Sequence, residues 1–165
     1  MKILLAADGS PFTRIAALHL VQHIEWFAKV PEIHIVHVHP PMPYPGAAAK
    51  AGKAAVAKYH REESEGALAV AERVLIKAGV AYTSSWEVGD VAERLAKCVK
   101  DRDIDLVIMG SHGHGALANL ALGSIATKCI ATLDVPIMIV RKSPRRKSSA
   151  KRERAAGAPP ATPGQ

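Results

Sequence analysis

The sequence predicts an α/β protein in which a five-stranded parallel sheet is covered by helices on both faces. Short apolar runs rich in β-branched residues alternate with longer segments of helical periodicity over residues 1–142. This alternation is typical of parallel sheets, because their crossover connections place helices on the sheet faces. The first run is apolar at nearly every position, as expected of a strand that is buried on both sides.

The first half of the chain is predicted to form two strands and two helices. The strand Lys2–Ala7 leads into a turn, where Ser10 suits a helix N-cap and Pro11 suits the first helical position. The prolines of residues 40–46 exclude a helix or a central strand. The expected elements after the turn are a helix over 11–29, a strand over 32–39, and a helix over 47–78 that Gly79 ends.

The second half is predicted to add three strands and two helices. The run Val80–Val88 alternates and carries polar residues, which favours an edge strand. The remaining elements are a helix over 91–102 capped by Asp90, a strand over 104–109, a helix over 124–132 and a strand over 134–141.

The positive charge of the chain is concentrated at its C-terminal end. Residues 141–165 hold eight Lys or Arg and one acidic residue, which gives this segment a net charge of +7. The formal net charge of the whole chain is also +7, so the rest of the chain is neutral. Because residues 143–165 have almost no large apolar side chains, we expect a folded domain over 1–142 and a basic disordered tail over 143–165. The tail is either a solubilising extension or a non-specific binder of polyanions such as nucleic acid.

The composition points to a cytoplasmic protein without a membrane span. No apolar run approaches about 18 residues. Asp8 interrupts the first apolar run before it reaches the roughly 7–15 residues of a signal-peptide core. Cys98 and Cys129 lie on the apolar stripes of predicted helices, so we expect buried free thiols.

Two groups of histidines raise the question of a metal site. His34, His37 and His39 share one strand, and His19 and His23 are four residues apart in a helix. No cysteine or acid stands directly beside the histidines of the first group, and the second group lacks the glutamate of the H-E-x-x-H motif. We therefore expect hydrogen-bonded or exposed histidines and no metal site.

Spaced glycines join a buried strand that ends at Met109 to a predicted helix. Two residues separate Gly110 from Gly113, nine separate Gly113 from Gly123, and Ser124 follows. Glycines let the backbone approach an anion, and the first N–H groups of a helix have no intrahelical partner. We expect a phosphate-binding loop with Ser124 at the helix cap; the alternative is a connection whose glycines serve only tight turns. The pattern matches neither the P-loop nor the dinucleotide motif.

This spacing resembles the nucleotide loop of the universal stress protein family, in its ATP-binding branch. The resemblance covers residues 1–142 and includes the Asp8 turn with Ser10, the pair His37-Val38 and the closing run 135–140. It implies a Rossmann-like fold with the sheet order 3-2-1-4-5. The order reverses between the first and fourth strands, where open α/β sheets bind ligands. Asp8 and Gly110 would then flank one crevice.

The resemblance also implies roles for individual residues. Asp8 resembles the group that hydrogen-bonds the ribose or adenine side, Val38 the contact to the adenine edge, and Met109 its apolar neighbour. Ala6 stands where some members have proline. His112 and His114 are either solvent-facing or in contact with a terminal phosphate. The expected nucleotide-binding set is Ala7, Asp8, Val38, Met109, Gly110, His112, Gly113, Gly123, Ser124 and Ile125.

The function expected from these features is a stress-response protein that binds ATP, with a divalent ion such as Mg²⁺ balancing the phosphate charge. The loop has no lysine and no evident general base, so hydrolysis should be slow at most, as in a sensor or switch. The alternative is an adenylation-type enzyme. The resemblance further implies a homodimer through the last strand, with Ile137, Ile139 and Val140 at the interface.

Overall fold

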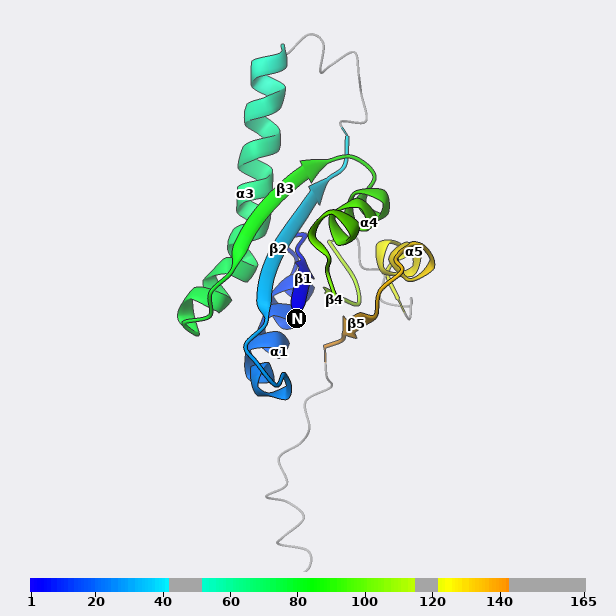
Figure 1. The fold of residues 1–165 in the computed structure, drawn as a ribbon. Coiled ribbons are helices and arrows are strands. Elements are labelled where there is room, and N and C mark those ends of the chain that lie inside the picture. Colours follow the sequence, from blue (N-terminus) through cyan, green and yellow to red (C-terminus); the bar gives the residue numbers. More distant parts are fainter. Residues whose placement is uncertain (42–51, 115–121, 143–165) are drawn as a thin grey trace, which may run out of the picture.

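The structure, a computed structural model, describes residues 1–41, 52–114 and 122–142. It confirms the predicted fold class. Five strands form one sheet in the order β3-β2-β1-β4-β5, and every neighbouring pair is parallel (Figure 1). The predicted tail over 143–165, most of the proline-rich loop and part of the glycine loop lie outside the described residues.

The bounds of the elements follow the alternation expected from the sequence. Three predicted elements have the expected bounds at both ends: the strand over 32–39, the Asp90-capped helix over 91–102 and the helix over 124–132. In chain order the elements are β1 (Lys2–Ala6), α1 (Pro11–Gln22), the 3₁₀ helix η1 (Ile24–Trp26), β2 (Glu32–His39), α3 (Lys53–Lys77), β3 (Thr83–Val88), α4 (Val91–Arg102), β4 (Leu106–Gly110), α5 (Ser124–Thr132) and β5 (Ile137–Val140).

The first helix is shorter than predicted. It ends at Gln22, because His23 leaves the helical region with φ −122° and ψ 22°. A short turn follows, in which the N–H of Trp26 donates to the carbonyl of His23 at 2.9 Å. Phe27 then packs against the core from an extended backbone, so the prediction of a helix to residue 29 was wrong.

The third and fourth strands begin later than predicted for one shared reason. The N–H of Val80 donates to the carbonyl of Leu75 at 3.0 Å, and the N–H of Ile104 donates to the carbonyl of Val99 at 3.0 Å. Each bond closes the C-terminal end of the preceding helix. A backbone N–H that caps a helix is not available to the sheet ladder, so pairing starts at Thr83 and at Leu106.

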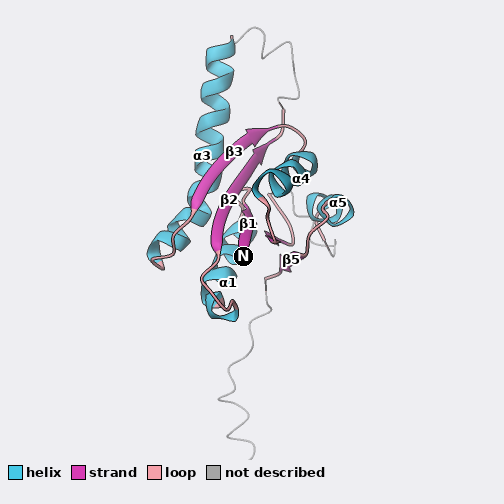
Figure 2. Cartoon of the chain, in the orientation of Figure 1, coloured by secondary structure: helices cyan, strands magenta, loops and turns pink. Residues whose placement is uncertain are grey.

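The strands bury side chains on both faces, as an alternating backbone requires. One core lies under α1 and α3 and includes Ile3, Leu5, Ile33, Ile35 and Ile108. The other lies under α4 and α5 and includes Leu4, Val36, Val38, Val107 and Met109. Figure 2 shows the two helix layers on either side of the sheet.

The two cysteines belong to the core under α4 and α5, which confirms the prediction of buried free thiols. Cys98 is 4% exposed and Cys129 is fully buried. Burial raises the pKa of both thiols, and that of Cys129 reaches about 11. Both groups are therefore protonated at neutral pH.

No helix within residues 1–41, 52–114 and 122–142 combines the length and the apolar character needed to cross a bilayer. The longest, α3, spans 25 residues but carries charged side chains along its length.

Candidate functional site

A cavity of about 500 Å³ lies at the carboxyl ends of β1 and β4, where the strand order reverses. Such switch points are where open α/β sheets bind ligands. The structure brings all ten residues of the expected set to this one cavity: Ala7, Asp8, Val38, Met109, Gly110, His112, Gly113, Gly123, Ser124 and Ile125. Seven further residues line it: Ala6, Thr13, Val36, Val91, Leu95, His114 and Ala126.

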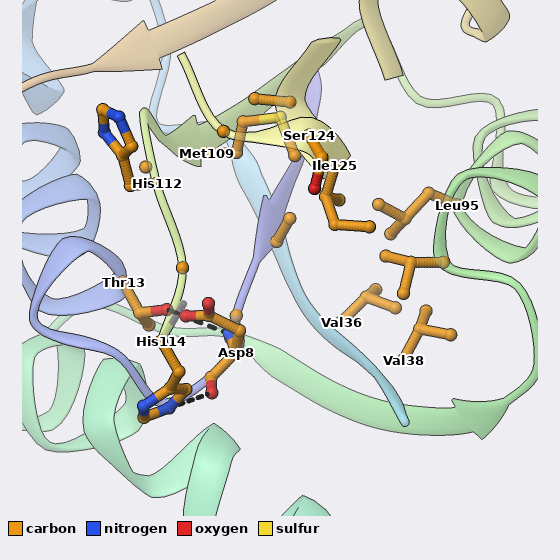
Figure 3. Close-up of a pocket in the computed structure, with 17 residues that line it drawn as sticks. Asp8, Thr13, Val36, Val38, Leu95, Met109, His112, His114, Ser124 and Ile125 are labelled. Atoms are coloured by element: carbon orange, nitrogen blue, oxygen red, sulfur yellow. Dashed lines mark hydrogen bonds between the residues drawn. The ribbon is translucent and has the colours of Figure 1, made fainter. Parts of the chain in front are cut away.

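The Asp8 turn forms one polar wall of the cavity (Figure 3). Oδ1 of Asp8 accepts hydrogen bonds from the N–H of Ser10 at 3.0 Å and from the hydroxyl of Thr13 at 2.7 Å. The Thr13 hydroxyl oxygen also accepts from the N–H of Asp8 at 2.9 Å. Ser10 caps α1, as predicted, with its hydroxyl accepting from the N–H groups of Phe12 and Thr13.

The glycine loop lies directly against this turn. A Cβ placed on Gly113 would lie 2.4 Å from Oδ2 of Asp8. The Nε2 atom of His114 lies 2.8 Å from the carbonyl oxygen of Asp8. The close approach of the loop to the Asp8 carboxylate therefore leaves no space for a side chain at position 113 unless the carboxylate moves.

The N-terminal end of α5 closes the cavity on the side of β4. Gly123, not Ser124, is the N-cap, and no side chain caps the helix. The prediction that the Ser124 hydroxyl caps the helix was wrong, because Ser124 is the first helical residue and is exposed. Its position leaves the first N–H groups of α5 beside the cavity, where they have no intrahelical partner.

The opposite wall is aliphatic. Val36 and Val38 point from β2, and Leu95 points from α4 on the same side (Figure 3). Val36 was predictable, because it lies two residues before Val38 and therefore on the same face of its strand. Leu95 lies in the predicted helix over 91–102, and nothing in the sequence placed it beside the glycine loop.

The buried histidines of β2 are hydrogen-bonded. The ring of His34 lies 2.6 Å from the hydroxyl of Thr83, and the ring of His37 lies 2.7 Å from the carbonyl oxygen of Ala7. Burial lowers the pKa of His37, so its neutral ring donates the N–H to Ala7 and supports the strand beside the cavity. Within the described ranges, no three His, Cys, Asp or Glu side chains gather as metal ligands do.

His39 forms a pair with His60 of α3 that the sequence did not reveal. Their Nδ1 atoms lie 3.2 Å apart, and Nδ1 of His39 also lies 2.6 Å from the carbonyl oxygen of Pro40. A carbonyl oxygen can only accept, so the contact with Pro40 places the proton on Nδ1 of His39. A hydrogen bond between the two rings then requires Nδ1 of His60 to be the acceptor and to carry no proton. Protonation of His60 at this atom would set two N–H groups against each other.

We expect this pair to make stability depend on pH. Burial and the neighbouring His39 lower the pKa of His60 from its ordinary 6.5. The unfolded chain therefore binds more protons than the folded chain as the pH falls through 6.5, and stability declines. A His60→Asn variant should lose less melting temperature than the parent between pH 7.5 and 5. An equal loss of melting temperature in the two proteins across that range would contradict the pairing.

The site defines a class of protein: a doubly wound α/β protein with a cavity at the switch point, walled by an acidic turn and by a helix N-terminus suited to an anion. The chain belongs to the universal stress protein family, whose family model matches residues 1–141.

Two relatives match most of the chain. A universal stress protein of Thermus aquaticus is 31% identical over 145 residues, which cover 84% of this chain and 97% of the relative. The universal stress protein MJ0531 of Methanocaldococcus jannaschii is 28% identical over 142 residues, which cover 86% and 82% of the two chains.

Solved structures share the fold. The protein MJ0577 has a TM-score of 0.71 at 25% identity, with 86% of this chain and 96% of that chain covered. A universal stress protein in complex with cAMP has a TM-score of 0.59 at 21% identity, covering 87% and 98%. A family member from Arabidopsis thaliana with AMP bound has a TM-score of 0.60 at 13% identity, covering 90% and 96%.

Proposed function

We propose that this chain binds ATP in the cavity between the Asp8 turn and the start of α5, and acts as a sensor or switch with slow hydrolysis at most. The observation that supports the proposal best is that one cavity joins an acidic turn, an aliphatic wall and uncapped helix N–H groups. A nucleotide has a sugar, a base and phosphates that match these three surfaces. Family members with bound AMP and cAMP support an adenine nucleotide.

The base would lie against the aliphatic wall. Val36, Val38 and Leu95 offer apolar contact to an adenine ring. The backbone of Val38 is at the end of β2, which suits a contact with the edge of the base.

The phosphates would lie at the start of α5. The N–H groups of Ser124 and Ile125 and the dipole of the helix favour an anion there. Among the described residues that line the cavity there is no lysine or arginine. Asp8 is their one carboxylate, so a Mg²⁺ ion would be held by the phosphates and water more than by protein side chains. With so little charge stabilisation from the protein, phosphoryl transfer should be slow.

The test is ATP binding by isothermal titration calorimetry with the Ile125→Glu variant. Ile125 lines the cavity on the first turn of α5 and is 42% exposed. A carboxylate at this position would repel the phosphates but suit the helix dipole, so the fold should persist. We expect the affinity for ATP to fall about tenfold or more, with a smaller loss in high salt.

Two variants control this experiment. Ile125→Gln has nearly the same shape as the glutamate variant without its charge, and it should keep most of the affinity. Ile130→Glu adds the same charge to an exposed position of the same helix, 53% exposed and outside the cavity. Equal affinity for ATP in the parent and Ile125→Glu, or no binding by the parent, would reject the proposed site.

The proposal includes a homodimer in the cytoplasm, joined through β5. This strand is at the edge of the sheet, and Ile137 and Ile139 are only partly buried in the single chain. Val140 is 6% exposed and belongs to the core, so its contribution would come from its backbone. Light scattering after size-exclusion chromatography measures the molar mass of the protein in solution, and the mass of a single chain would reject the dimer.

A further inference from the structure

A single hydroxyl holds Asp8 by both its backbone and its side chain. Oγ1 of Thr13 donates to Oδ1 of Asp8 at 2.7 Å and accepts from the N–H of Asp8 at 2.9 Å. Thr13 is 2% exposed and lies in the first turn of α1. As a buried β-branched residue it has little rotamer freedom, so this arrangement is rigid.

The arrangement leaves the two oxygens of the Asp8 carboxylate unequal. Within the described part of the chain, both hydrogen bonds that the carboxylate accepts go to Oδ1, from Ser10 and Thr13. Oδ2 faces the Cα of Gly113 at the edge of the cavity. A ligand therefore meets one oriented acceptor, which is suited to a hydroxyl donor.

We propose that Thr13 is a positioning residue that fixes Oδ2 of Asp8 as the acceptor for the sugar hydroxyls of the nucleotide. The inference rests on the proposed function. Without the Thr13 hydroxyl, the N–H of Ser10 is the one described donor left on Oδ1, and this single bond leaves the carboxylate freer to turn about its terminal torsion, which has no sharp preferred angle. The contact with the sugar then loses its geometry, while the base and phosphate contacts keep theirs.

The experiment compares ATP with 2′,3′-dideoxy-ATP by calorimetry on the full chain. Thr13→Val has nearly the shape of threonine and lacks the hydroxyl. The parent should bind ATP more tightly than the dideoxy compound. Thr13→Val should lower the affinity for ATP about tenfold and leave the affinity for the dideoxy compound unchanged. Thr13→Ser, which keeps the hydroxyl, should restore tight ATP binding.

Two outcomes would overturn the inference. One is an unchanged affinity of Thr13→Val for ATP. The other is an equal loss for both nucleotides, which is what a merely structural role of Thr13 would produce. If the parent bound neither nucleotide, the proposed function itself would fail, and that result is distinct from both. Melting curves verify that each variant folds, and Thr13→Ala repeats the test if valine prevents folding.

Discussion

Replacing Gly110 by alanine is expected to lower the stability of the chain by about 3 kcal/mol, because the new methyl group has no space. Gly110 ends β4 under the first turn of α1. Its Cβ would lie 2.6 Å from Cβ of Phe12 and 3.0 Å from the carbonyl carbon of the same residue. The second contact is with backbone, so the strand and α1 would have to separate. Thermal unfolding should show a melting temperature lower by roughly 10 °C.

Gly66 provides the matched control. It lies inside α3, and a Cβ at this position would meet no atom within 4 Å. Gly66→Ala should raise stability by about 0.5–1 kcal/mol, because alanine favours the helix and restricts the unfolded chain. Similar melting temperatures for Gly110→Ala and the parent would show that β4 and α1 are not in contact at this position.

Replacing Gly113 by alanine is expected to lower the affinity for ATP about tenfold or more by displacing Asp8. The Cβ would lie 2.4 Å from Oδ2, and the carboxylate cannot simply rotate away because Thr13 and Ser10 hold Oδ1. Calorimetry measures the affinity. The stability should change less than in Gly110→Ala, because the clash is with a side chain at the edge of the cavity.

A double-mutant cycle shows whether this effect passes through Asp8. Asp8→Ala removes the carboxylate and makes room for the methyl group at position 113. Adding Gly113→Ala to Asp8→Ala should therefore cost no further affinity. Additive losses would mean that Gly113 acts on the ligand through its own backbone, as a phosphate cradle does.

The sequence was sufficient for the layers of the fold because these follow from local patterns, and the family resemblance supplied the sheet order and most residues of the cavity. The alternation of strands and helices predicted the layers, and the spaced glycines and the Asp8 turn stand at the ends of two strands that the family order makes neighbours. Thr13 was missed because its hydroxyl acts through the three-dimensional form of one turn. Leu95 was not placed at the site because only the packing of α4 on the sheet brings it beside β2.

The late starts of β3 and β4 have a common origin. Apolar content marks where a strand is buried, but the hydrogen bonds of Val80 and Ile104 to preceding helices decide where pairing begins. The cap of α5 follows the same principle. Serine is a frequent N-cap, yet Gly123 occupies that position and its N–H donates to the carbonyl of Ser111 at 2.8 Å. Such competition between backbone partners is settled by tertiary contacts.

The burial of Cys98 and Cys129 bears on the sensing role proposed for this chain. A protonated thiol enclosed by aliphatic side chains reacts poorly with peroxides, electrophiles and glutathione disulfide. The two cysteines of the folded chain should therefore leave oxidants undetected. Under the proposed function, an oxidative signal would instead reach the chain through changes in the cellular pool of the nucleotide.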